Sequence, residues 1–129
     1  MLKSDYFIVN LNVFPFDIMF SINETDDVLL KRLRKYKINE EELLKFMYNY
    51  ENSNGRTCIF STNHTVIRLT QKDDKCDLDL IGTLAHEIFH AVTFILNEIG
   101  IKYELGVSDE VYAYCIGHVT KCAFSNMDI

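Results

Sequence analysis

Residues 77–100, DLDLIGTLAHEIFHAVTFILNEIG, form the longest apolar stretch of the chain and decide its fold. The stretch contains no proline; Asp77 is suited to cap its start, and Gly100 to end it. These signals predict a helix over residues 78–99. Apolar residues recur along it every three or four positions, as on the buried face of a helix: Ile81, Leu84, Ile88, Val92, Ile95 and Ile99. We therefore expect one central helix packed against the core.

The run HEIFH lies in the middle of this helix, away from the apolar stripe. His86 and His90 are four residues apart, so both imidazoles project from one helix face and can reach a single zinc ion. Burying ionisable groups on such a helix costs free energy unless they are paired or metal-bound, which favours a ligand role. Glu87 is then placed to act as general base on a zinc-bound water. The competing interpretation is that both histidines are hydrogen-bonded core residues and that the H-E-x-x-H spacing is coincidental.

A third zinc ligand is expected on the last helix of the chain. Zinc sites of this kind take two histidines and one carboxylate and keep one position open. Glu110 lies 20 residues after the HEIFH run, in the first turn of a helix that Ser108 caps and that runs to about Phe124. Gly100 and Gly106 bracket a loop that would return this helix antiparallel to the central one. The alternative role for Glu110 is a favourable interaction with the helix dipole.

The same helix supplies candidate donors for an oxyanion. Tyr114 follows Glu110 by one turn and is the preferred donor, with packing as its competing role. Tyr112 and His118 are further candidates, although His118 lies two turns on and to one side. Asp109 either orients a ligand imidazole or starts the helix, and the sequence does not separate these roles.

The N-terminal half predicts a small sheet and two short helices. The expected strands lie within Tyr6–Ile22, interrupted at Pro15, and at Thr57–Ser61 and Thr65–Leu69; the expected helices are Asp26–Tyr36 and one that starts at Asn39. Glu42 is expected to complete a capping box with Asn39. Residues 57–61 and 65–69 are interpreted as a hairpin or two adjacent strands.

An extended peptide is expected to bind by β-addition to Thr65–Leu69, through backbone hydrogen bonds. Arg68 would then contact an acidic group of the substrate or, more simply, face solvent. His64, in the strand connection, would approach the cleft or stand exposed in a turn. The basic run at residues 31–37 is interpreted as a solvated helix face.

Composition limits the class of protein. The 129 residues are the size of one domain, 1–129, without repeats or linkers. A net charge of −6 gives no general attraction to nucleic acid or to anionic membranes. The N-terminus lacks a signal-peptide core, and no uninterrupted apolar run reaches the length of a membrane span. Four cysteines without a C-x-x-C pair suit reduced thiols, so we expect a cytoplasmic protein of undetermined oligomeric state.

The stretches TLAHEIFHAV and DEVYAYCIGHVTK resemble small single-domain zinc metallopeptidases of phages and mobile elements, within the gluzincin branch of the zincins. The resemblance covers roughly residues 57–121. It implies zinc ligands at His86, His90 and Glu110, a catalytic base at Glu87, and a strand before the central helix that forms the substrate-binding edge. The chain lacks the N-E-x-x-S-D string and the C-terminal subdomain of larger gluzincins.

The expected fold is therefore α+β: a minimal zincin-like domain with a small antiparallel or mixed sheet on the HExxH helix and a following helix that carries Glu110. The expected function is zinc-dependent hydrolysis of a peptide or protein substrate. Two other functions stay open. One is a zinc-stabilised binding or regulatory protein without turnover, and the other is a structural domain without metal. The sequence does not indicate the substrate.

Overall fold

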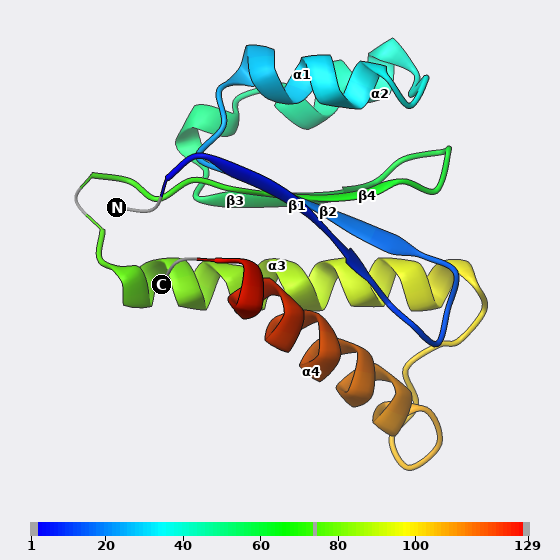
Figure 1. Cartoon of the computed structure of the whole chain (residues 1–129). Helices are drawn as coiled ribbons and strands as arrows, with labels where there is room; N and C mark the ends of the chain where they lie inside the picture. The colour runs from blue at the N-terminus through cyan, green and yellow to red at the C-terminus, as the bar shows by residue number, and fades with distance from the viewer. Residues whose placement is uncertain (1–2, 74, 128–129) are drawn as a thin grey trace.

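The computed structural model of the chain describes residues 3–73 and 75–127 and has three layers (Figure 1). The strands are β1 (Asp5–Asn10), β2 (Asp17–Ile22), β3 (Gly55–Ile59) and β4 (Thr65–Leu69). The helices are α1 (Asp26–Arg34), α2 (Glu40–Met47), α3 (Asp77–Glu98) and α4 (Asp109–Asn126), with a 3-10 turn, η1 (Tyr50–Asn52). Figure 1 shows α1 and α2 over one face of the sheet, and α3 with α4 on the other. This confirms a small α+β domain with a mixed sheet.

The strand order β1–β2–β4–β3 joins two hairpins at the centre of the sheet. β1 with β2 and β3 with β4 are antiparallel, whereas β2 and β4 are parallel. Pro15 lies in the β1–β2 connection, as the sequence predicts, and Asn12 there has a φ of 65°. β3 is an edge strand, but β4 lies between β2 and β3 with every residue buried. The prediction that a peptide adds to Thr65–Leu69 is therefore wrong, because both edges of that strand are already paired.

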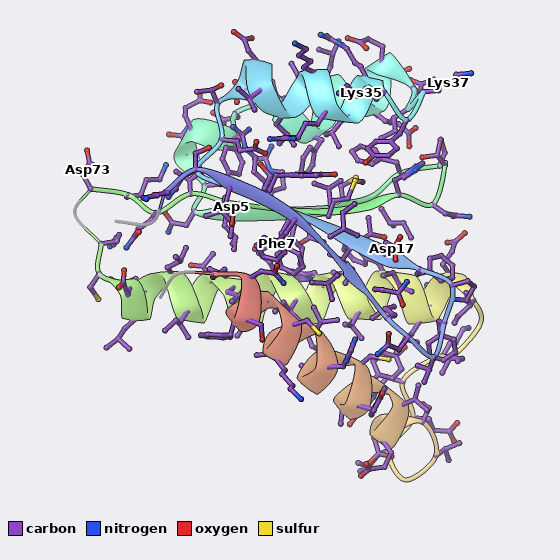
Figure 2. The ribbon with its side chains drawn as sticks, in the orientation of Figure 1. Asp5, Phe7, Asp17, Lys35, Lys37 and Asp73 are labelled. Carbon is purple, nitrogen blue, oxygen red and sulfur yellow. The ribbon has the colours of Figure 1, made fainter. Side chains whose placement is uncertain are left out.

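The main core lies between the sheet and the α3–α4 layer. Its sheet side includes Phe20, whose ring stacks on that of Phe7 with centroids 4.9 Å apart. Figure 2 shows Phe7 between the β1 ribbon and α3. α4 contributes a stripe of buried residues: Tyr112, Cys115, Val119 and Ala123. In Figure 1 this helix starts far from the sheet and runs obliquely up to the level of α3, and it contacts β1 as well as α3.

α3 has almost the predicted bounds, but its N-cap is Cys76 rather than Asp77. Of the predicted stripe, Leu84, Ile88, Val92 and Ile95 are buried, Ile81 is half-buried, and Ile99 is exposed at the C-terminus. By length and composition α3 is also apolar enough to cross a membrane, a test that core helices pass as well. Here its apolar side packs against the sheet and α4.

In the α1–α2 layer, the predicted helix cap at Asn39 is confirmed, but the predicted capping box with Glu42 does not form. Asn39 Oδ1 accepts hydrogen bonds from the backbone N–H groups of Glu41 and Glu42. The Glu42 carboxylate binds the backbone N and the Oγ of Ser61 instead of closing the box on Asn39. It thereby ties α2 to the β3–β4 turn.

The basic run at residues 31–37 forms mostly a solvated helix face, as expected. Lys31, Lys35 and Lys37 are exposed, and Figure 2 shows Lys35 and Lys37 on the helical layer. Two of its members are engaged in ion pairs. Arg34 pairs with Glu40, and Arg32 donates to the buried carboxylate of Glu24 at 2.8 Å.

Arg68 corrects another expectation, since it neither faces solvent nor points toward a substrate site. Its side chain is 4% exposed and pairs with Asp26 Oδ1 at 2.7 Å. It also donates to the backbone O of Glu24, and its guanidinium lies 3.9 Å from the centroid of the Tyr50 ring. This side chain anchors the start of α1 to the centre of the sheet.

Candidate functional site

The two histidines of the HEIFH run meet on the exposed side of α3. His86 Nε2 and His90 Nε2 lie 3.1 Å apart, with ring centroids 4.7 Å apart and planes 76° from each other. The His86 side chain is 66% exposed, and His90 is half-buried. The prediction that these imidazoles share one helix face, away from the apolar stripe, is confirmed. The competing interpretation, in which both histidines are core residues, is wrong for His86, because its side chain is mostly exposed.

Glu87 turns the other way, toward the sheet, and is only 6% exposed. Its Oε1 accepts a hydrogen bond of 2.7 Å from Thr57 Oγ1 on β3. Its Oε2 lies 3.9 Å from His86 Nε2. One buried carboxylate therefore joins the edge strand to the histidine pair.

An open cleft of about 460 Å³ runs along α3 beside these groups. Its lining residues come from α3 and from the start of β3: Asn54, Gly55, Leu78, Asp79, Gly82, Thr83, His86 and Glu87. The outward edge of β3 has no neighbouring strand in the described part of the chain. The ionisable side chains of His86 and Glu87 therefore lie on one side of the cleft, and the unpaired edge of β3 begins on the other.

Gly55 allows β3 to lie this close to α3. A Cβ atom at this position would be 2.9 Å from Thr83 Cγ2 and 3.0 Å from Glu87 Cγ. Neither Gly55 nor Thr57 is among the site residues predicted from the sequence. Their signal is a tertiary contact between segments 30 residues apart, which no local pattern reveals.

The polar side chains around Glu87 continue to η1. The Tyr50 hydroxyl lies 3.0 Å from Thr70 Oγ1. Burial raises the pKa of Tyr50, and the negative charge of Glu87 raises it further. At neutral pH this phenol is therefore neutral and hydrogen-bonded to Thr70.

Glu110 lies in the first turn of α4 and is exposed. Within residues 3–73 and 75–127, no three His, Cys, Asp or Glu side chains are grouped so that they could hold a metal ion. The structure therefore brings His86, His90 and Glu87 together but does not bring Glu110 into a ligand group with them.

The candidate oxyanion donors on α4 have other partners. Tyr112 is buried, and its hydroxyl donates to the backbone O of Ile101 at 2.6 Å. His118 Nε2 lies 2.7 Å from the backbone O of Asn10. Tyr114 is 52% exposed, with its ring stacked on that of His118. Of these side chains, Tyr114 has the freest hydroxyl, since no hydrogen bond engages it among the described residues.

Two further candidates are engaged locally. Asp109 Oδ1 accepts a hydrogen bond of 3.0 Å from the backbone N of Gly106, which fits the helix-start role. His64 lies against the Tyr36 ring, on the side of the sheet that α1 and α2 cover, with centroids 4.6 Å apart. Its Nδ1 is 2.8 Å from Thr62 Oγ1, so His64 belongs to the turn rather than to the cleft.

The histidine pair can be tested for its fit to zinc. Two imidazole nitrogens bound at 2.0–2.1 Å in a tetrahedral site lie about 3.3 Å apart, close to the 3.1 Å found here. Without metal, the same distance requires one nitrogen to carry a proton and the other to accept it. On the next turn, Thr93 Oγ1 is buried with no hydrogen-bond partner among the described residues. The two imidazoles therefore fit as two of the four ligands of a tetrahedral zinc site. The other two ligands must come from other side chains or from water.

Comparison of the chain with models of protein families, with curated proteins and with solved structures gives no match.

Proposed function

We propose that the chain is a zinc-dependent peptidase whose metal is held by His86, His90 and Glu110 and whose base is Glu87. The observation that supports this most directly is the 3.1 Å approach of two imidazole Nε2 atoms beside a buried carboxylate and an open cleft. Glu110 is proposed as the third ligand because it is a carboxylate in the first turn of α4, the helix that follows α3. Its recruitment requires the loop at residues 99–108, which holds Gly100 and Gly106 at positive φ, to change its path.

The edge strand is the proposed peptide-binding element. The free edge of β3 offers backbone N–H and C=O groups to an extended chain, which would then run along the cleft past Glu87. Such pairing selects an extended backbone more than particular side chains. This replaces β4 with β3 as the strand to which a substrate adds.

Glu87 is the proposed proton carrier. A bound zinc ion would supply Lewis-acid polarisation of the scissile carbonyl and a lower pKa for water. The Glu87 carboxylate accepts a proton from the attacking water and delivers it to the leaving amine nitrogen, so that one water is consumed and an acid and an amine are released. Tyr114, whose hydroxyl is accessible, is proposed as a donor to the developing oxyanion.

The experiment combines metal analysis with cleavage profiling. Purified protein is expected to carry about one zinc per chain, and less than about 0.2 would contradict a zinc site. New protein N-termini are then compared in a cell lysate treated with the native chain or with Glu87→Gln. Peptidase function predicts N-termini that only the native chain generates, while both proteins retain zinc.

A second candidate function is a zinc-stabilised binding protein without turnover. The separation of Glu110 from the histidine pair favours it, because a metal held without that carboxylate lacks the expected catalytic ligand set. For this function, Glu87→Gln would retain zinc and partner binding, and the lysate would show no new N-termini with either protein.

A further inference from the structure

The polar contact between β3 and α3 is made by a threonine in the middle of the edge strand. Thr57 Oγ1 lies 2.7 Å from Glu87 Oε1 and 3.2 Å from the backbone O of Glu87. Within the described ranges, Thr57 is the side chain that hydrogen-bonds the Glu87 carboxylate. The hydroxyl has one proton, and the shorter contact to a negatively charged oxygen receives it.

Strand alternation directs Thr57 to this contact. Its neighbours Arg56 and Cys58 lie on the other face of the sheet, where Arg56 donates to the backbone O atoms of Phe46 and Tyr48 and Cys58 packs into the core under α1 and α2. The period of two then turns Thr57 toward α3. Gly55, two positions earlier on the same face, removes the side chain that would hold the strand away from Glu87.

We propose that Thr57 is a positioning residue for Glu87: its hydroxyl fixes Oε1 and leaves Oε2 directed toward the histidine pair and the cleft. This inference rests on the proposed role of Glu87 as the base. A glutamate side chain has three rotatable bonds, and this one has a second contact only at 3.9 Å, from Oε2 to His86 Nε2. Loss of the hydroxyl would release Oε1 and let the carboxylate rotate away from the orientation required to take a proton.

The position of Thr57 also links the base to substrate binding. The residue that fixes Glu87 belongs to the strand whose free edge is proposed to pair with the peptide. A peptide that pairs with β3 would restrain the same backbone that carries the Thr57 hydroxyl. The base is therefore held most firmly when the edge strand is occupied.

The test compares Thr57→Val, which keeps the shape and removes the hydroxyl, with Thr57→Ser, which restores the hydroxyl. The matched control is Thr65→Val, since Thr65 is also a strand threonine, although fully buried where Thr57 is half-buried, and its Oγ1 has no hydrogen-bond partner within the described ranges. Thr57→Ala serves as the second hydroxyl-free variant if Thr57→Val does not fold. Turnover is measured on a quenched fluorescent peptide built around a site cleaved in the lysate.

For Thr57→Val we expect kcat to fall on the order of 10-fold to 100-fold, with KM and the dissociation constant for Zn²⁺ within about 2-fold of native. Thr57→Ser and Thr65→Val are expected to keep kcat within about 3-fold of native. An unchanged kcat in Thr57→Val, or an equal loss in Thr57→Ser, would overturn the proposal.

A second measurement separates this inference from the proposed function. Three-bond NMR couplings report the χ1 and χ2 angles of Glu87 in the metal-free protein and need no substrate. We expect one rotamer in the native chain, Thr57→Ser and Thr65→Val, and rotamer averaging in Thr57→Val. A single native rotamer in Thr57→Val refutes positioning by Thr57 even if the peptidase is active. If Glu87 averages between rotamers in Thr57→Val and the native chain cleaves no peptide, the result supports the Thr57–Glu87 contact and refutes the peptidase function.

Discussion

His86 Nε2 and His90 Nε2 lie 3.1 Å apart on consecutive turns of α3, so the two imidazoles can bind a common proton or a common metal ion. The buried carboxylate nearest to the pair, that of Glu87, lies 3.9 Å from His86 Nε2, beyond hydrogen-bond distance. The helix itself therefore holds the two imidazoles next to each other. The free-energy cost of this arrangement in the metal-free protein is small because His86 is well exposed.

Zinc is expected to stabilise the chain through this pair. At a free zinc concentration about 1,000-fold above the dissociation constant, binding adds about 4 kcal/mol to the free energy of unfolding and raises the thermal midpoint by roughly 10 °C. The variant His86→Ala/His90→Ala should lose this increment, as measured by thermal unfolding with and without a chelator. His64→Ala, which changes a histidine in the β3–β4 turn, should retain it. Equal increments in both variants would argue for zinc binding elsewhere.

Gly55→Ala should destabilise the contact between β3 and α3. The added Cβ would lie 2.9–3.1 Å from atoms of Thr83, Glu87 and Leu69, so the strand or the helix must shift. We expect a loss of about 1–3 kcal/mol in urea unfolding. The control is Gly82→Ala, at a helix position where a Cβ meets nothing within 4 Å. That change should instead add about 0.5–1 kcal/mol, since alanine has the higher helix propensity.

Arg68→Met should be destabilising, although methionine is nearly as long as arginine and is apolar. It removes the cation buried between Asp26, the Glu24 backbone and the Tyr50 ring. We expect a loss of about 1–3 kcal/mol in the free energy of unfolding, because the buried Glu24 carbonyl loses its charged donor and the Tyr50 ring its cation, whereas Asp26 is 62% exposed and stays solvated. Arg34→Met breaks an ion pair that is exposed on both sides and should have little effect. A loss in Arg68→Met no larger than that in Arg34→Met would contradict the anchoring role.

The cysteines should differ in their reactivity toward alkylating agents. Burial raises the pKa of the Cys58 thiol to about 11, and the nearby Glu42 carboxylate adds to this. Alkylation requires the thiolate, so at pH 8 only about one Cys58 in a thousand is reactive. Iodoacetamide at this pH should label the exposed Cys76 well before Cys58, and Cys58 labelling should accelerate as the pH rises toward 11. Peptide mapping by mass spectrometry measures both rates, and faster labelling of Cys58 at pH 8 would contradict the shift.

Local patterns predicted the elements well because their signals are local. The apolar run with a capping residue and a terminal glycine located α3 within one residue at each end. Ser108 occupies the N-cap position of α4 as predicted, but its hydroxyl donates to the backbone O of Lys102 and does not cap the helix. The spacing of His86 and His90 fixed their shared helix face, since four residues make about one helical turn.

What the sequence left open depends on contacts between distant segments. The position of Glu110 relative to the histidine pair depends on how the loop at residues 99–108 sets the oblique crossing of α4, which no spacing rule specifies. Arg68 looked like an exposed strand residue because Glu24, to whose backbone it donates, lies 44 positions away. The edge strand was misassigned for a similar reason: the parallel pairing of β2 with β4 decides which strand is outermost.

This parallel pair also has a consequence for the order of folding. The β1–β2 and β3–β4 hairpins each close a short connection, whereas pairing of Ile18 with Thr65 encloses α1, α2 and β3. Loop-closure entropy rises with the length enclosed, and distant pairing slows folding. We expect both hairpins to form early and their union along β2 and β4 to limit the rate. The helix that carries HEIFH gains a continuous sheet to pack against only after that step, so the candidate site would be among the last parts of the protein to assemble.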